Sequence, residues 1–221
     1  MSFDYISYRK TKRNGKYKLF KRTAKMLEMI RKYKAKDSLC ILDVGAADGF
    51  MLNTFKNQLS VKVCLGIEPS LDYIKSNSVK GIQIIQAIGE ELPFRSNIFD
   101  VVTAASVIDH MGDSNLFLRE CDRVLKDGGI LAITLASPFY DALAVRFRIK
   151  EDDHRSHFTE GRLRAALEEE GFLVNEISRF ALPFFGVAFE KYIEIILNLV
   201  GLRRAMFYIV AIGQKYYKYQ K

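Results

Sequence analysis

The sequence ILDVGAADG, at residues 41–49, decides the fold that we expect for this chain of 221 residues. A short apolar run ends in an acid, Asp43, and the small residues after it form a tight turn that leads into a helix. A second apolar run ends in GIEP at residues 66–69, where Glu68 is a lone carboxylate. The pattern predicts two strands of one sheet, with the turn and the acid at the same edge.

The turn and the acid together indicate a site for a nucleoside. Small residues at 45–49 let the backbone approach a ligand closely, and the start of the following helix presents unpaired N–H groups. A lone acid at the tip of the second strand is the usual way in which such folds hold the two hydroxyls of a ribose. Without Glu68, the glycine pattern would be much weaker evidence for a nucleoside site.

Apolar runs alternate with helical patterns along the rest of the chain. Near-continuous apolar strands are typical of a parallel sheet that is covered on both faces, with the ligand at the carboxyl ends of the strands. We therefore expect an α/β fold, a doubly wound and mostly parallel seven-stranded sheet (Rossmann-like) whose last strand is antiparallel. The expected strands are 39–44, 61–67, 82–85, 98–105, 129–135, 172–179 and 206–213, and the expected helices are 17–33, 49–58, 70–76, 114–125 and 159–170.

Charge is distributed unevenly along the chain. Residues 1–36 hold 13 Lys and Arg against two acids, a balance of +11, whereas the remainder has a balance of −3. We divide the chain into a basic N-terminal arm and cap helix (1–36) and the main domain (37–221), with a helical cap insertion at about 181–204. The basic segment is either a solvated surface or a site for phosphate groups. Its helix has four apolar residues at helical spacing, which we expect to face the core: Phe20, Ala24, Leu27 and Ile30.

Three features predict a cytoplasmic protein. Cys40, Cys64 and Cys121 fall in expected strands and a helix, so we interpret them as core thiols in a reducing compartment. The N-terminus has no apolar signal region. The apolar stretch 184–200 contains charged residues such as Glu190, which argue against a membrane span.

Four motifs follow one another between residues 39 and 172. They are ILDVGAADG at 41–49, Glu68, GEELPF at 89–94 followed by FDVV at 99–102, and LRECDRVLKDGG at 118–129. In this order the sequence resembles the class I S-adenosylmethionine-dependent methyltransferases, specifically the small type 11 group related to ubiquinone- and sterol-type enzymes. The resemblance implies an enzyme (EC 2.1.1.-) that transfers the methyl group of S-adenosyl-L-methionine directly to an acceptor and releases S-adenosyl-L-homocysteine.

The resemblance also implies which residues bind the cofactor. The first motif lies under the methionine and ribose, and Glu68 holds the ribose hydroxyls. Ala47 stands where glycine is commoner, and Ile88 stands where many relatives have an aspartate that contacts adenine, so the adenine amino group would use a backbone carbonyl or water. The expected cofactor residues are Asp43, Gly45, Ala46, Ala47, Gly49, Glu68, Pro69, Ile88, Gly89, Glu90, Ala105 and Ser106.

The histidines are the candidate general bases, which a hydroxyl or amine acceptor would require. His110, beside Asp109, follows the fourth strand at the edge where acceptor should meet cofactor, although it could instead order that loop. His154 is the better acceptor-facing candidate, and His157 could order the entry to a helix that Thr159 caps. Two histidines three residues apart bind a metal only with further ligands, so we expect none.

Aromatic residues in the last third indicate an acceptor of apolar character. They lie where relatives of the resembled family insert a substrate cap, and they either pack onto the sheet or form a lid over a hydrophobic or lipid-linked acceptor. With the basic arm, such a lid suggests contact with an anionic membrane at the inner surface. The expected acceptor-side residues are His157, Tyr140, Phe184 and Phe185.

We therefore expect methyl transfer to a small-molecule, lipid or glycan acceptor. An RNA methyltransferase, with the basic N-terminus along the phosphates, is the first alternative. A cofactor-binding relative that has lost transfer activity is the second.

Overall fold

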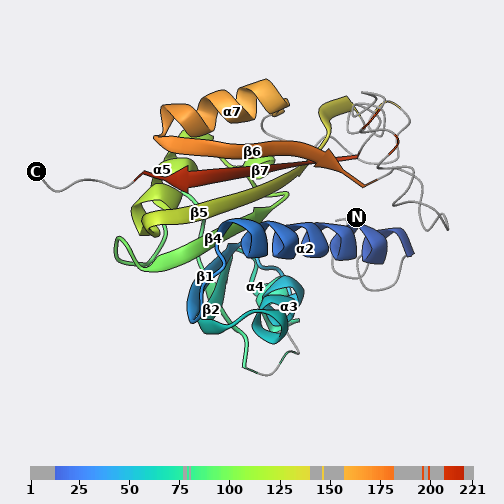
Figure 1. The fold of residues 1–221 in the computed structure, drawn as a ribbon. Coiled ribbons are helices and arrows are strands. Elements are labelled where there is room, and N and C mark those ends of the chain that lie inside the picture. Colours follow the sequence, from blue (N-terminus) through green and yellow to red (C-terminus); the bar gives the residue numbers. More distant parts are fainter. Residues whose placement is uncertain are drawn as a thin grey trace, which may run out of the picture.

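The computed structural model describes residues 13–76, 79, 81–139, 146, 157–181, 196, 199 and 207–216. These residues form a sheet of seven strands in the order β3-β2-β1-β4-β5-β7-β6, with β7 antiparallel to both of its neighbours. Helices lie on both faces of the sheet (Figure 1). The expected doubly wound fold, including its antiparallel last strand, is confirmed.

The element bounds agree closely with the apolar runs. The strands are β1 (Leu39–Val44), β2 (Val61–Glu68), β3 (Gln83–Gln86), β4 (Phe99–Ala105), β5 (Leu125–Ala136), β6 (Phe172–Phe180) and β7 (Tyr208–Lys215). The helices are α2 (Arg13–Tyr33), α3 (Phe50–Gln58), α4 (Leu71–Lys75), the 3-10 helix η1 (Ile108–His110), α5 (Ser114–Val124) and α7 (Glu160–Glu169). Thr159 caps α7 as predicted, since its side chain accepts from the amide of Arg162. None of the described helices has both the length and the apolarity to cross a membrane.

One strand begins earlier than the sequence suggests. The run at 129–135 predicts a strand after a turn, whereas β5 starts at Leu125, opposite Phe99 of β4. The pairing register shifts between Phe99 and Val101, so that irregular pairing accommodates the Asp-Gly-Gly residues within the strand.

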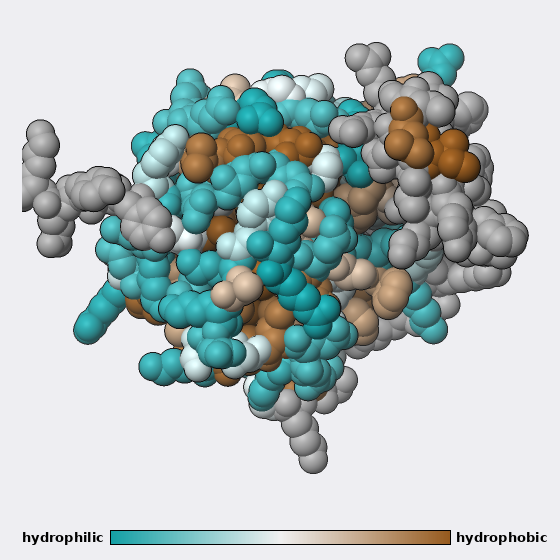
Figure 2. All heavy atoms as spheres, in the orientation of Figure 1, coloured by the Kyte–Doolittle hydropathy of each residue, from teal (hydrophilic) through white to brown (hydrophobic). Residues whose placement is uncertain are grey.

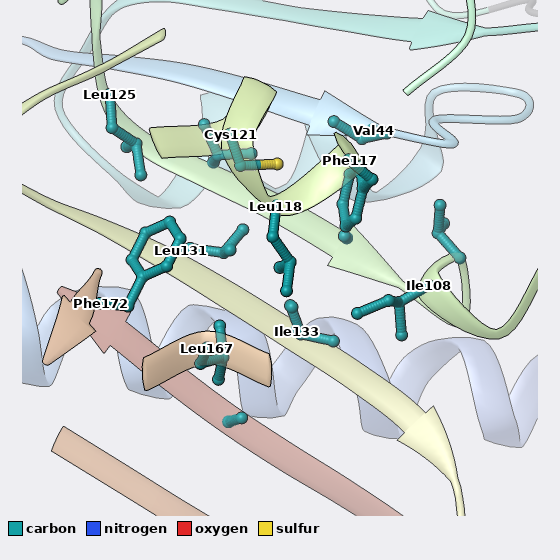
Figure 3. Packing of buried hydrophobic residues seen from close by; sticks show 14 of the residues in the cluster. Val44, Ile108, Phe117, Leu118, Cys121, Leu125, Leu131, Ile133, Leu167 and Phe172 are labelled. Atoms are coloured by element: carbon teal, nitrogen blue, oxygen red, sulfur yellow. The ribbon is translucent and has the colours of Figure 1, made fainter. Parts of the chain in front are cut away.

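Apolar side chains fill both faces of the sheet. Figure 3 shows one core, where Phe117, Leu118 and Cys121 of α5 and Leu167 of α7 lie against β5. On the other face, Met26, Met29 and Ile30 of α2 and Phe55 of α3 pack against β1, β4 and β5. Cys40 and Cys121 are buried, and burial raises the pKa of Cys121 and raises that of the half-buried Cys64 to about 12. The prediction of core thiols is confirmed for Cys40 and Cys121, whereas Cys64 is only partly buried.

The buried face of α2 differs from the one that we expected. Leu27 and Ile30 are buried, but Phe20 is 64% exposed and Ala24 is also exposed. The residues one position earlier face the core instead, and Arg22 lies among them: Leu19, Arg22, Thr23 and Met26 are buried. The hydroxyl of Thr23 donates to the carbonyl of Leu19 at 2.8 Å, and this hydrogen bond offsets the cost of burying the hydroxyl. Two overlapping apolar stripes share this helix: both are buried in its second half, whereas in its first half packing buries Leu19 and leaves Phe20 exposed.

Asp100 ties the start of the sheet to the segment after α2. It is 1% exposed and accepts from the Cys40 amide at 3.0 Å, from Lys126 Nζ at 2.8 Å and from Lys36 Nζ at 3.1 Å. Burial acts to raise the pKa of Asp100, but these three hydrogen bonds outweigh it and hold the pKa below its ordinary value. The ionised carboxylate therefore stabilises the fold.

We expect Asp100→Asn to lower the free energy of unfolding by about 2 kcal/mol at pH 7, the range for hydrogen bonds to a charged group. Because the folded pKa is lowered, this contribution is complete above the unfolded pKa of about 4 and is lost as the pH falls through the folded value. The difference between parent and variant should thus shrink below about pH 5. Urea unfolding across this pH range measures it. Asp127→Asn, at an exposed position, is the control, and equal stabilities of parent and Asp100→Asn at pH 7 would contradict the argument.

The strand latest in the sequence lies inside the sheet, not at its edge. β7 pairs with β5 on one side and with β6 on the other, so β6 joins the sheet through β7 alone among the described strands. At its end, Lys215 is 4% exposed, and its Nζ donates to the carbonyls of Asp122 and Leu125 at 2.8 Å and to Asn97 Oδ1 at 2.9 Å. β7 therefore also satisfies carbonyl groups near the end of α5.

Candidate functional site

The turn after β1 is held close to β2. The amides of Gly45 and Ala46 both donate to the carbonyl of Ile67 at 2.9 Å. Gly45 has a φ of 73°, and a Cβ built on it would lie 2.5 Å from Val107 Cγ2. Ala47 also has a left-handed φ, 49°, which costs a non-glycine residue roughly 1 kcal/mol. Ala47, where glycine is commoner, is thus a strained alanine in this turn.

Glu68 joins the turns that follow β1 and β2. Its side chain is buried, with 6% of the residue exposed. Oε2 accepts from the amide of Ala47 and Oε1 from the amide of Ser70, both at 3.0 Å. A carboxylate has about four lone-pair sites in all, and these two amides each use one of them. Ala47 and Glu68, 21 positions apart in the sequence, thus bring the two motifs into direct contact.

Apolar side chains lie exposed beyond the neighbouring strands. Ile88, after β3, is 50% exposed, and Leu71, after β2, is 49% exposed. The segments are linked because Gln86 Nε2 donates to the carbonyl of Pro69 at 3.1 Å. A carboxylate that can accept from a diol, together with apolar side chains exposed after β2 and β3 for a flat ring, fits the nucleoside part of S-adenosylmethionine.

The third and fourth motifs bind each other. Arg123 of α5 donates to the carbonyls of Phe94 at 2.7 Å and Leu92 at 3.0 Å, and it pairs with Glu120, whose carboxylate accepts from the Leu92 amide. The hydrogen bond from Arg123 is the main cause that lowers the pKa of Glu120. Glu90 Oε1 accepts from the amide of Gly112 at 2.7 Å, which fixes the same loop to the segment after η1. The Arg-Glu pair of α5 thus holds the loop that carries Ile88, Gly89 and Glu90.

The carboxyl end of β4 carries the Asp109-His110 pair. Asp109 is 3% exposed and His110 is exposed, within η1. Nearby in the sheet, Thr103 Oγ1 donates to Asp43 Oδ1 at 2.7 Å, so the acid at the end of β1 is held by β4. Ser106 follows Ala105 with a left-handed φ of 57°.

Of the expected acceptor-side residues, the structure describes His157. His157 is exposed before α7, and its carbonyl accepts from Arg162 Nη1 at 2.6 Å. His154, Tyr140, Phe184 and Phe185 lie outside the described residues, as does most of the proposed cap insertion at 181–204. Within the described part of the chain, no group of three or more His, Cys, Asp or Glu side chains could hold a metal ion.

Sequence reasoning missed Arg22. It is 5% exposed, and its Nη1 donates to Ser106 Oγ at 2.7 Å, which brings a guanidinium from α2 to the carboxyl end of β4. The same guanidinium lies 5.6 Å from the ring centroid of Tyr208. Arg22 is inconspicuous in the sequence because so many basic residues surround it. The signal for its burial was that Leu19 and Met26, three and four residues away, lie on the same side of the helix.

Comparison with known proteins gives one family match. Residues 42–133 match the family model described as a methyltransferase domain. This range includes the turn after β1, Glu68 and the loop that Arg123 holds.

Curated relatives agree with the match. The chain is similar to malonyl-[acyl-carrier protein] O-methyltransferase 1 of Coxiella burnetii, 29% identical over 53% of this chain and 40% of that protein. It is also similar to the demethylmenaquinone methyltransferase of Corynebacterium urealyticum, 36% identical over 42% of this chain and 40% of that protein. The chain spans less than half the length of these curated relatives.

The fold itself recurs in a complex between the Trm112 methyltransferase activator of Haloferax volcanii and a candidate methyltransferase. The TM-score is 0.73, with 15% sequence identity, over 98% of this chain and 100% of the other. At this identity the likeness concerns the fold.

Proposed function

We propose that the chain, in which residues 42–133 match a methyltransferase domain, acts as a class I S-adenosylmethionine-dependent enzyme and methylates a small-molecule, lipid or glycan acceptor. The observation that carries the proposal is the buried carboxylate of Glu68, fixed by the amides of Ala47 and Ser70. When bound, S-adenosylmethionine supplies an electrophilic methyl group on a sulfonium. The residues of the chain bind and orient the donor and exclude water around the acceptor.

Each expected cofactor residue has a proposed part. Glu68 accepts from the ribose hydroxyls, and the backbone of 45–49 borders the methionine end. Ile88 and Leu71 border the adenine, whose amino group then uses a backbone carbonyl or water. Arg22, joined to Ser106, adds a buried positive charge at the carboxyl end of β4. The remaining expected positions, among them Asp43, Pro69, Gly89, Glu90 and Ala105, shape these loops.

The removal of a proton from the acceptor is assigned to His154, with Asp109 and His110 as the alternative. We expect His154→Ala to lower kcat by about 100-fold, the low end for loss of a general base, while the Kd for S-adenosylhomocysteine stays the same. Steady-state kinetics and calorimetry on one preparation measure both. Glu169→Ala, at an exposed position of α7, is the control. Equal turnover of His154→Ala and parent would transfer the role to His110.

The acceptor class is tested by label transfer. The purified chain is incubated with S-adenosylmethionine carrying a radioactive methyl group and with fractionated cell extract. We expect label in the organic-soluble or small-molecule fraction. Label in RNA would support the nucleic-acid alternative, and in that case RNA affinity should fall steeply with salt. Cofactor binding without transfer to any fraction would support a relative that has lost its activity.

A further inference from the structure

The first half of α2 presents a basic and aromatic surface. Phe20 is 64% exposed, Lys16 is exposed, and Lys21 Nζ lies 5.7 Å from the ring centroid of the partly exposed Tyr17. We call Lys16, Tyr17, Phe20 and Lys21 the α2 face. Residues 15–21 of the sequence contain three lysines and no acid. A large apolar side chain that is mostly exposed among cations is unusual on a helix whose other side is well packed.

The α2 face lies at the carboxyl edge of the sheet, where the acceptor must enter. The bond from Arg22 to Ser106 fixes the middle of the helix at the end of β4. Lys18 Nζ lies 4.6 Å from the ring centroid of Phe207, which precedes the antiparallel β7 and so lies at the same edge. Residues before Arg22 extend about 1.5 Å each further along the helix axis. In Figure 1 this end of α2 points to the same side as the arrowhead of β6.

A second exposed aromatic side chain lies at this edge. Phe139 follows β5 by three residues and is 64% exposed. Figure 2 shows hydrophobic atoms among the hydrophilic surface around the end of α2. Aromatic rings that are exposed beside lysines favour an interface with both an apolar layer and negative charge.

Charge complementarity identifies the occupant. The first 36 residues carry a balance of +11, whereas the rest of the chain carries −3, so an anionic surface attracts the chain by this end. Lysines near an anionic leaflet strengthen binding severalfold each, and phenylalanine inserts shallowly at the headgroup level. RNA would satisfy the lysines but would not require two phenylalanines that are exposed at one edge.

We propose that the α2 face docks on bilayers that contain anionic phospholipid. Docking holds the carboxyl edge of the sheet against the membrane, where an amphiphilic acceptor is dissolved. The docking stands independently of the reaction, and only the delivery of an acceptor rests on the proposed function.

The test uses the full chain and two kinds of vesicle, phosphatidylcholine alone and an equal mixture of phosphatidylcholine and phosphatidylglycerol. The parent should sediment with the mixed vesicles and not with the neutral ones, and binding should weaken as salt rises. We expect the Lys16→Glu/Lys21→Glu double variant to bind about 30-fold more weakly and Phe20→Ser about 5-fold more weakly. The matched controls are Lys62→Glu, at an exposed position of β2, and Leu116→Ser, 40% exposed on α5, and both should bind as the parent does.

Calorimetry with S-adenosylhomocysteine separates docking from the proposed function. Phe20→Ser should retain cofactor affinity, and Glu68→Ala should retain vesicle binding. The docking proposal is overturned if the parent protein does not bind anionic vesicles. It is also overturned if the control variants weaken vesicle binding as much as Phe20→Ser does. Docking also fails as a proposal if Phe20→Ser binds vesicles normally and structured RNA displaces the protein from them. None of these results alters the test of Glu68.

Discussion

Replacing Glu68 by alanine should weaken the binding of S-adenosylhomocysteine by about 30-fold, or roughly 2 kcal/mol, the scale for hydrogen bonds to a charged group. The proposed role of Glu68 requires its carboxylate to accept from the ribose hydroxyls. The same carboxylate holds the amides of Ala47 and Ser70, so alanine also removes what fixes the two turns. Titration calorimetry on the purified chain measures the Kd.

Two variants show which of these losses matters. Glu68→Gln keeps the shape and one acceptor oxygen, so it should bind the cofactor more tightly than Glu68→Ala and less tightly than the parent. Asp72→Ala removes an exposed acid in the first turn of α4 and should have no effect. Unfolding curves establish that each variant is folded at the temperature of the titration. An unchanged Kd in Glu68→Ala would refute the ribose assignment, and an unchanged Kd in Glu68→Gln would assign the effect to the shape of the turns.

The second large effect is expected at Gly45. Alanine there should lower the free energy of unfolding by roughly 3 kcal/mol, because a left-handed φ costs a side chain 1–2 kcal/mol and overpacking adds a similar amount. The overpacking is specific, since the new Cβ would lie 2.5 Å from Val107 Cγ2. The turn would also have to move, so cofactor affinity should fall with stability.

Gly171 provides a matched comparison for this variant. Its φ is 84°, and a Cβ there has no other atom within 4 Å, so Gly171→Ala has the backbone cost without the contact. We expect it to lose about 1 kcal/mol. The Gly45→Ala/Val107→Ala double variant removes the contacting methyl groups and should regain part of the loss when compared with Val107→Ala alone. If urea unfolding gave Gly45→Ala and Gly171→Ala the same loss of unfolding free energy, the contact with Val107 would contribute nothing to that loss.

The sequence predicts the sheet well because its strands are buried on both faces. Runs such as 39–44 contain few polar residues, and their spacing leaves little choice of fold once a turn and an acid follow the first two strands. The contact between Glu68 and Ala47 was likewise predictable in kind, because neighbouring parallel strands end at the same edge.

Packing decided what the sequence could not predict. The α2 helix has two apolar stripes that are both buried in its second half, whereas in its first half Leu19 and Arg22 are buried and Phe20 is exposed. The early start of β5 depends on irregular pairing with β4 across a segment that resembles a turn. In both cases the local sequence pattern is compatible with two structures, and contacts with residues distant in the sequence determine which one forms.

The place of β7 in the sheet has a consequence for biosynthesis. A ribosome releases residues 172–180 well before residues 208–215, yet β6 has no described partner in the sheet until β7 has paired with β5. During that interval the edge of β5 that β7 will cover remains open to other strands. We therefore expect the nascent chain to be most prone to non-native strand pairing just before β7 emerges.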